Sequence, residues 1–299
     1  MKIAAVFATM NRRDTAETCL RRLAGQTRPP DLVVVADNAS TDGTLEALKS
    51  LPALSFPLEI LELGENRGNA GGIEAAMERA FDLGSEAVWI LDDDSWPEPD
   101  ALERLLDPAG PAEGIRSSLV VDPATGRPSW PFQVMIGGDW SLVTEVPAGS
   151  DWLRVRRSWL GVLVPRGLRD RIGPVLGDLF LRGEDEDYPR RIEAAGVAVH
   201  LATRSVLHHP PGGRLHHGRF FGRTVALEAD LPAAKLYYRL RNSWWLTRRD
   251  QGLPAAAVLV ACHGWLLLRH QRPLGEGLHG AARALADAFR DRLGRRDDL

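Results

Sequence analysis

Three consecutive aspartates, Asp92, Asp93 and Asp94, follow a short apolar run, Ala87 to Leu91, that we interpret as a buried strand. Adjacent carboxylates repel one another, and burying an unpaired carboxylate is costly. In an extended chain, side chains alternate between faces, which places Asp92 and Asp94 on one side and Asp93 on the other. Two carboxylates on one side suit a hard divalent cation that also binds substrate phosphates. The alternative is a solvated acidic turn before the helix that follows Pro97.

Two further polar stretches follow predicted strands. In VVVADNASTDGT, a strand ends in Asp37, whose carboxylate can accept hydrogen bonds from a base or a ribose; the alternative is a plain polar turn. In LGENRGNAGGIEAAMERA, four glycines surround two asparagines and an arginine. Glycines let a backbone approach phosphates, and a helix N-terminus favours anions. The stretch matches neither the dinucleotide-binding nor the Walker pattern, and its alternative is a loop leading into a helix.

Acidic and histidine clusters occur near residues 184 and 208. Four consecutive acids, Glu184 to Asp187, precede a predicted helix. Acids near a helix N-terminus are mildly stabilising, which explains one or two of them but not four. Crowded carboxylates raise one another's pKa, a property that suits a general base. His208 and His209 follow an apolar run, and a histidine there can complete a metal site begun by two aspartates; the alternative is an ordinary loop pair.

The elements that position these groups alternate between strand and helix. Asp14 is expected to cap the first helix, and Asp42 or Thr41 the second. This rhythm predicts an α/β fold with a mainly parallel central sheet flanked by helices, which binds ligands at the carboxyl ends of its strands. The predicted elements are strands Ile3–Thr9, Leu32–Ala36, Leu58–Leu63, Ala87–Leu91 and Val197–Ala202, helices from Thr15, after Asp42, over Ala70–Leu83 and over Asp185–Ala195, and helices from Leu231 onward.

Composition limits the class of protein. The 299 residues are 44% hydrophobic and 26% charged with a net charge of −3, which is typical of a soluble globular protein and gives no indication of a nucleic-acid partner. The two cysteines, Cys19 and Cys262, form no disulfide framework and indicate a reducing compartment. The N-terminus lacks the long apolar segment and cleavage site of a signal peptide. We therefore predict a cytoplasmic protein.

Taken together, these motifs resemble the family 2 glycosyltransferases of the GT-A fold. In family order, over roughly residues 1 to 245, the resemblance rests on VFATMNR, QTRPPDLVVVADNASTDGT, NRGNAGG, LDDD with PEPDAL, and GEDEDYPRRIEAAG with His208 downstream. The NAGG loop, the triple Asp, EDxDY and the later YYRLRN resemble bacterial galactofuranosyltransferases and their rhamnosyltransferase relatives. Gly183 stands where the galactofuranosyl polymerases carry a Trp, which leaves the donor sugar open.

The resemblance implies an inverting, metal-dependent transfer from a nucleotide-diphospho-sugar, of the UDP-galactofuranose or dTDP-rhamnose type, to a glycan or lipid-linked acceptor. It implies Asp185 as the general base. It implies Mn²⁺ or Mg²⁺ held by Asp92, Asp94 and His208, with a slip of register to His209 left open. The donor-binding residues that it implies are Thr9, Asn11, Arg12, Asp37, Asn66, Arg67, Gly71, Asp92 and Asp93, with Asp37 on the nucleoside and Asp93 toward the ribose or sugar.

The expected organisation is a catalytic domain over residues 1–230 and a helical region over residues 231–299. The catalytic domain is expected to divide into a nucleotide-binding half, 1–115, and an acceptor-binding half, 116–230. The long extra domains of the polymerases are missing from this chain, which favours a single-addition enzyme. Two other classes compete. A nucleotidyltransferase usually has a glycine-rich basic loop after its first strand, where this chain reads ATMNRRD. A sugar-binding module without chemistry would not need its acids and His208 intact.

The C-terminal region raises the question of a membrane. Tyr237, Tyr238, Trp244 and Trp245 lie among four arginines, a composition suited to a helix at a lipid headgroup surface. Leu253 to Leu268 is apolar but only 16 residues long, short of the roughly 20 that span a bilayer. The alternatives to peripheral contact with the inner face of the membrane are a helical hairpin packed on the catalytic domain and a homo-oligomer interface.

Overall fold

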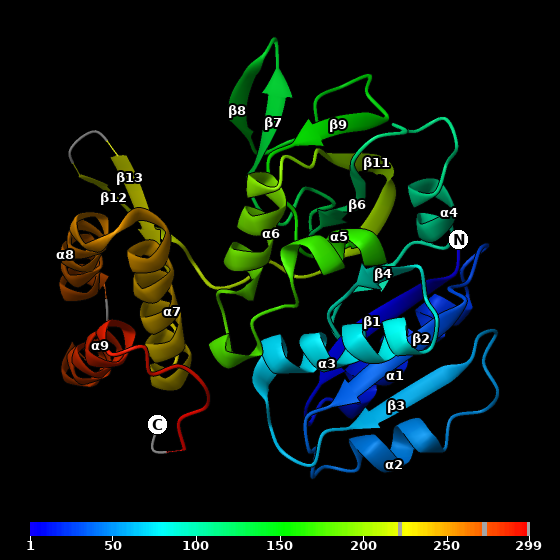
Figure 1. Cartoon of the computed structure of the whole chain (residues 1–299), viewed down its shortest axis with the longest axis horizontal. Coiled ribbons are helices and arrows are strands. Elements are labelled where there is room, and N and C mark those ends of the chain that lie inside the picture. The colour runs from blue at the N-terminus through cyan, green and yellow to red at the C-terminus, as the bar shows by residue number, and fades with distance from the viewer. Residues whose placement is uncertain (221–222, 271–273, 298–299) are drawn as a thin grey trace. The chain divides into compact units, whose positions relative to one another are not determined.

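The computed structural model describes the chain except residues 221–222, 271–273 and 298–299 (Figure 1). The chain forms two compact units. The first comprises residues 1–176 and 188–211, and the second comprises residues 177–187 and 212–299. This division differs from the predicted boundary at residue 230, because the segment carrying Asp185 and the segment 212–230 both pack with the C-terminal helices.

One large sheet organises the first unit, in the order β3-β2-β1-β4-β10-β6-β11-β9-β7-β8, with β5 beside β11. Strands β3, β2, β1 and β4 are parallel, as are β6 and β11, whereas β10 joins the two groups antiparallel to both neighbours. The α/β fold predicted for the chain is confirmed. The strands are β1 (Ile3–Thr9), β2 (Leu32–Asp37), β3 (Leu58–Glu62), β4 (Ala87–Ile90), β5 (Trp96–Pro97), β6 (Ile115–Val121), β7 (Phe132–Ile136), β8 (Asp139–Val143), β9 (Trp152–Val155), β10 (Val162–Pro165) and β11 (Val199–His208).

Helices cover both faces of this sheet (Figure 1). Because side chains alternate along a strand, Ala5 and Phe7 of β1 pack into one apolar cluster and Val6 and Ala8 into the other. The first cluster contains residues of α1 (Arg13–Ala24), α2 (Thr44–Lys49) and α4 (Ala101–Leu105). The second contains residues of α3 (Gly68–Asp82), α5 (Arg166–Ile172) and, from Tyr188 onward, α6 (Glu184–Ala194). Burial on both faces explains why these strands are continuous apolar runs.

The helix starts differ slightly from the prediction. Helix α1 begins at Arg13, so Asp14 is not its cap and lies in the first turn, where a carboxylate still interacts favourably with the helix dipole. Gly43, and neither Asp42 nor Thr41, is the cap residue of α2, although Oδ1 of Asp42 accepts a hydrogen bond of 3.0 Å from the backbone N–H of Thr44. These local differences leave the strand ends, and hence the site, in place.

The second unit consists of a β-hairpin, β12 (His216–Phe220) and β13 (Arg223–Leu227), and helices α7 (Ala233–Gln251), α8 (Leu253–His270) and α9 (Leu274–Phe289). Its core combines Phe180, from the segment before α6, with buried residues of the three helices. Helix α8 is 18 residues long, and among the described residues it is the one helix long and apolar enough to cross a membrane by these two criteria alone.

Candidate active site

Three parallel strands end at the same edge of the sheet. The register places Thr9, the last residue of β1, opposite Asp37, the last residue of β2. On the other side of β1, Val6 lies opposite Ile90, where β4 ends. The chain leaves the sheet after Ile90 and turns at Asp93 and Asp94. Polar groups from three distant parts of the sequence therefore gather at the carboxyl edge, the usual ligand site of such sheets.

Asp93 lies apart from the other two acids and is buried. Its Oδ2 accepts a hydrogen bond of 2.8 Å from the hydroxyl of Thr9, and its Oδ1 accepts one of 2.8 Å from Arg12. The same guanidinium also donates to Oδ2 of Asp94 at 2.8 Å. Burial raises the pKa of Asp93 to about 6, although the charge of Arg12 acts in the opposite direction. Arg12 thus holds the acidic turn against the end of β1.

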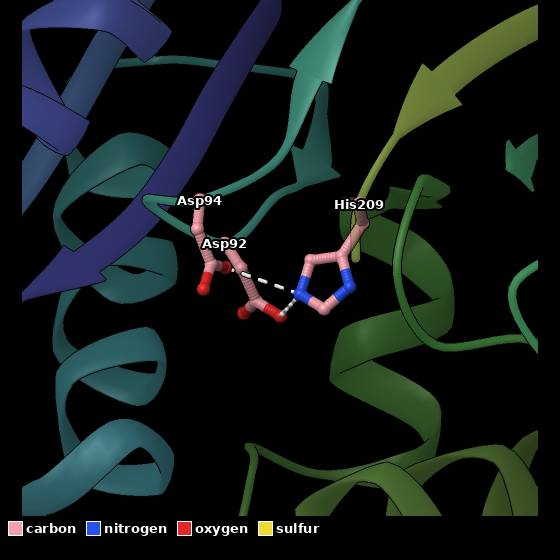
Figure 2. A group of neighbouring side chains, drawn as sticks. All are labelled: Asp92, Asp94 and His209. Atoms are coloured by element: carbon pink, nitrogen blue, oxygen red, sulfur yellow. Dashed lines mark ion pairs between the residues drawn. The ribbon is translucent and has the colours of Figure 1, made fainter. Parts of the chain in front are cut away.

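Asp92 and Asp94 converge on one histidine, His209, which reaches toward them from just beyond the end of β11 (Figure 2). His209 Nε2 lies 3.1 Å from Oδ1 of Asp94 and 3.6 Å from Oδ2 of Asp92. One ligand atom from each of the three residues lies within 4.8 Å of the other two. Two carboxylate oxygens and an imidazole nitrogen are a ligand set that a divalent cation such as Mn²⁺ accepts.

The electrostatics of this group fit a cation. Burial acts to raise the pKa of Asp94, but the hydrogen bond and charge of His209, together with Arg12, hold that pKa well below its usual range. Burial acts to lower the pKa of His209, but Asp94 and Asp92 outweigh it and raise that pKa. The two carboxylates therefore favour the protonated form of His209. Metal ions bind neutral imidazole, so a divalent cation would take the place of this proton.

His208, which the resemblance implies as the metal ligand, lies elsewhere. Its Nε2 is 2.5 Å from Oε1 of Glu98, and its ring stacks on Trp96 with centroids 6.3 Å apart. Consecutive residues at the end of a strand point in opposite directions, so one histidine or the other can meet the aspartates, but not both. The geometry favours His209, the register that the sequence left open.

Trp130 and Ser129 contact His209 and orient it, and the sequence motifs did not indicate either residue. Trp130 packs on the imidazole with ring centroids 5.2 Å apart. Ser129 donates a hydrogen bond of 2.7 Å from its hydroxyl to the backbone carbonyl of His209. Both residues lie between β6 and β7, about eighty positions away in sequence, and no periodic pattern marks them. Their contacts stiffen the part of the site contributed by β11.

Asp37 is almost fully buried at the end of β2. Its Oδ2 accepts a hydrogen bond of 3.1 Å from the N–H of Ser40, while its buried Oδ1 has no hydrogen-bond partner among the described residues. A buried acceptor without a partner is costly, and a hydroxyl or amine of a ligand would satisfy it. Asn11 lies across from this turn, where its Oδ1 accepts a hydrogen bond of 2.7 Å from the N–H of Thr41. This hydrogen bond therefore joins the loops that follow β1 and β2, and the second of these loops begins at Asp37.

The glycine-rich loop forms the start of α3. Asn66 Oδ1 accepts a hydrogen bond of 2.8 Å from the N–H of Gly68, the first residue of the helix. Gly71 has no room for a side chain, since an added Cβ would lie 2.7 Å from Cβ of Arg67. Asn38, which the sequence motifs did not single out, bonds to both Arg67 and Gly68 with its amide group. These three predicted residues therefore have structural roles in the loop, and any contact with a donor adds to them.

The four acids form the first turn of α6 and differ sharply in their surroundings. Asp187 is fully buried and paired with Arg249 at 2.6 Å, Glu184 is buried, and Glu186 is paired with Arg239. Asp185 is the exposed member, and its Oδ1 accepts a hydrogen bond of 3.0 Å from the N–H of Gly183.

Asp185 also has an altered acidity. Dehydration by the surrounding protein, followed by the negative charge of Glu186, raises the pKa of Asp185 above its ordinary value. Arg239 and the hydrogen bond from Gly183 oppose this rise. The side chain remains exposed to solvent, so water screens part of the effect. An accessible carboxylate with a raised pKa has the properties of a general base.

The known proteins to which this chain is similar are glycosyltransferases. Residues 5–115, from β1 to the start of β6 and including the three aspartates, match the family described as Glycosyl transferase family 2. Galactofuranosyltransferase GlfT1 of Mycolicibacterium smegmatis is 26% identical over 280 residues, 91% of each chain. N-acetylglucosaminyl-diphospho-decaprenol L-rhamnosyltransferase of Mycobacterium tuberculosis is 26% identical over 227 residues, covering 64% of this chain and 71% of the relative.

A solved structure shares the fold. Mannosyltransferase PcManGT of Pyrobaculum calidifontis, in complex with GDP-Man and Mn²⁺, superposes with a TM-score of 0.54 at 24% identity and covers 97% of this chain and 75% of its own. The architecture is therefore that of the GT-A sugar transferases. Within that fold, residues 5–115 match the family 2 glycosyltransferases, and the chain is a glycosyltransferase similar to bacterial galactofuranosyl- and rhamnosyltransferases. His209 and Asp185 lie outside the segment that the family match covers.

Proposed function

We propose that this enzyme transfers a sugar, with inversion, from a nucleotide-diphospho-sugar to a glycan or lipid-linked acceptor and requires Mn²⁺ or Mg²⁺. The observation that carries the proposal is the convergence of Asp92, Asp94 and His209 at the carboxyl edge of the parallel sheet. When bound there, a divalent cation neutralises charge on the diphosphate leaving group. Asp37 accepts a hydrogen bond from the nucleoside through its free Oδ1, and Arg12 keeps the acidic turn in position.

The proposed reaction is a direct displacement. Asp185 removes the proton from the acceptor hydroxyl, the oxygen attacks the anomeric carbon, and the nucleoside diphosphate leaves from the opposite side. One displacement inverts the anomeric centre. The names of the relatives support a donor of the UDP-galactofuranose or dTDP-rhamnose type, and the name of the rhamnosyltransferase specifies a decaprenol-linked molecule, which supports a lipid-linked acceptor.

The experiment that tests this function is a screen of nucleotide-sugars with the purified chain. Release of nucleoside diphosphate is measured by chromatography with Mn²⁺, with Mg²⁺ and with a chelator. We expect turnover of one donor, and we expect the chelator to abolish it. Nuclear magnetic resonance should show that the anomeric configuration of the product is inverted relative to that of the donor. Turnover that is unaffected by the chelator, or a product of retained configuration, would contradict the proposal.

The two adjacent histidines provide a matched pair of variants. His209→Ala is expected to weaken the Mn²⁺-dependent binding of UDP by about 10–100-fold, the effect typical of groups that support a metal site. His208→Ala is expected to leave this affinity unchanged, because its ring contacts Glu98 and Trp96 instead. Titration calorimetry with UDP in the presence of Mn²⁺ measures both. The reverse result would assign the ligand role to His208.

An enzyme that acts on a lipid-linked acceptor must work at a membrane. We therefore propose a membrane-binding surface on α8. The aromatic residues that the sequence singled out are used inside the second unit, since Trp244 is buried against His263 and Trp245 donates to Asp291. Helix α8 instead exposes apolar side chains along most of its length, ending beside Arg269, whose guanidinium lies 5.3 Å from the ring of Trp265. The exposed apolar residues are Leu253, Ala257, Val258, Ala261, Trp265 and Leu268.

A charged residue in this α8 surface should prevent lipid binding. We expect the wild-type chain to sediment with anionic vesicles at low salt, and Leu268→Glu to remain in the supernatant, because a carboxylate resists entry into the interface. Leu142→Glu is the control, since Leu142 of β8 is 69% exposed and lies in the first unit. Equal sedimentation of wild type and Leu268→Glu would refute the surface. If Leu268→Glu instead halves the mass measured by light scattering, the α8 surface is a homo-oligomer interface.

A further inference from the structure

The motif YYRLRN, Tyr237 to Asn242, has no role in the chemistry described above, yet its charged and amide groups are buried. It lies in the first half of α7. Arg241 has no exposed surface and Asn242 only 1%, and a buried guanidinium requires several hydrogen-bond acceptors. Arg241 donates to the carbonyls of Asp178 and Leu179, which lie in the segment before Asp185, and also to Gly294 and Asn242. The contacts lie wholly within the second unit.

Asn242 binds backbone carbonyls of this segment. Its amide nitrogen donates to the carbonyls of Leu179 at 2.9 Å, Leu181 at 3.1 Å and Arg182. Arg241 sets the orientation of the amide, because its Nε donates to Asn242 Oδ1 at 2.8 Å and so leaves the amide N–H groups facing the carbonyls. Arg241 itself adds a hydrogen bond of 2.9 Å to the carbonyl of Leu179. These two side chains of α7 therefore hold one short stretch of backbone, before Asp185, by its carbonyl groups.

The backbone held by Arg241 and Asn242 has a conformation that residues with a Cβ disfavour. Phe180 and Arg182 have φ angles of +64° and +67°, in the left-handed region that residues with a Cβ disfavour. Gly183 follows with a φ of +106°. A Cβ at Gly183 would lie 3.0 Å from Cβ of Asn242, so glycine allows the close approach of α7.

Helix α7 also contacts one of the acids that follow this stretch of backbone. Arg239 pairs with Glu186, and the N–H of Gly183 donates to Asp185. The backbone that holds the Asp185 carboxylate is therefore the backbone that Asn242 holds. We propose that Arg239, Arg241 and Asn242 form a clamp on the segment 177–187 that orients Asp185 for proton removal. This inference rests on the proposed function, and it makes the three residues positioning residues that need not touch the substrate.

Asn242→Ala in the full chain tests the clamp, with Gln251→Ala as control, since Gln251 is an exposed amide at the end of the same helix. We expect faster amide hydrogen exchange in peptides from 177–187 for Asn242→Ala alone. We also expect kcat for transfer to fall by about 10–100-fold, as for a misplaced catalytic group, with KM for the donor unchanged. Unchanged exchange in this segment would overturn the clamp.

Arg239→Gln gives a second readout in case Asn242→Ala folds poorly. The groups facing Asp185 are Glu186, which raises its pKa, and Arg239 and Arg182, which lower it. Loss of the Arg239 charge should therefore raise the pKa further and move the acidic limb of the kcat profile to higher pH. A pH profile identical to wild type would overturn the role of Arg239. If Asn242→Ala speeds exchange while kcat stays unchanged, the segment is clamped but the clamp does not position the base; this outcome overturns the inference and leaves the role of Asp185 to the Asp185→Asn variant.

Discussion

Sugar transfer by Asp185→Asn is expected to be about 10²–10⁴-fold slower than by the wild type, the usual contribution of a positioned base. Asparagine keeps the size and the hydrogen bond from Gly183 but cannot accept the proton of the acceptor hydroxyl. Donor binding should survive, because the diphosphate is held by other residues. Initial rates at saturating donor and calorimetry with the donor separate the two effects.

The neighbouring acids serve as controls for this variant. Glu184→Gln, Glu186→Gln and Asp187→Asn remove carboxylates that are buried or ion-paired, so we expect losses of thermal stability that exceed their losses of rate. A general base at Asp185 must be deprotonated in order to accept the proton of the acceptor hydroxyl. Because the pKa of Asp185 is raised, activity should disappear on acidification at a higher pH than an ordinary aspartate would give. If Asp187→Asn is inactive and Asp185→Asn works normally, the base is misassigned by two residues.

Asp94→Ala is expected to abolish Mn²⁺-dependent binding of the nucleotide-sugar while the fold remains intact. Asp94 contributes one of three converging ligand atoms, and loss of a direct ligand should cost at least the roughly 10–100-fold typical of supporting groups. Titration calorimetry with donor and Mn²⁺ measures the affinity, and circular dichroism checks the fold. Asp139→Ala, at an exposed aspartate of β8, is the matched control.

Donor affinity equal to wild type in the Asp94 variant would remove the metal site from the mechanism. Asp94 belongs to an acidic turn in which Arg12 contacts both Asp93 and Asp94. A loss of affinity seen in Asp94→Ala but absent from Asp139→Ala, with circular dichroism unchanged, would show that the effect arises at the acidic turn. The result with Asp94→Ala is then independent of the result with Asp185→Asn, since one concerns binding and the other the rate.

Much of the first unit follows from local sequence patterns. The predicted strand Ile3–Thr9 agrees with β1 at both ends, and the predicted strand Leu32–Ala36 is one residue shorter than β2. These strands are buried on both faces, so they are apolar up to their last residues, Thr9 and Asp37, and the apolar run shows where each strand lies. The grouping of Asp92 with Asp94 was also expected from alternation, although the chain turns there instead of continuing as a strand.

Long-range choices were beyond the reach of such patterns. Membership of the segment 177–187 in the second unit depends on contacts with α7, which lies some sixty residues later in the chain. The membrane surface was expected at Trp244 and Trp245, which are amphipathic in composition but are hydrogen-bonded to His263 and Asp291. Composition states what a helix could contact, whereas packing decides which of its faces remains exposed.

The sequence by itself determined the fold class, the acidic edge of the sheet and the family, because apolar periodicity and short motifs are local properties of a chain. The tertiary structure alone decided that His209 meets the two aspartates, since a shift of one residue at a strand end reverses a side chain's direction. It alone decided that Asp185 is the exposed one of four acids. Successive positions in a helix point about 100° apart, and only the packing of the helix selects the one that faces solvent.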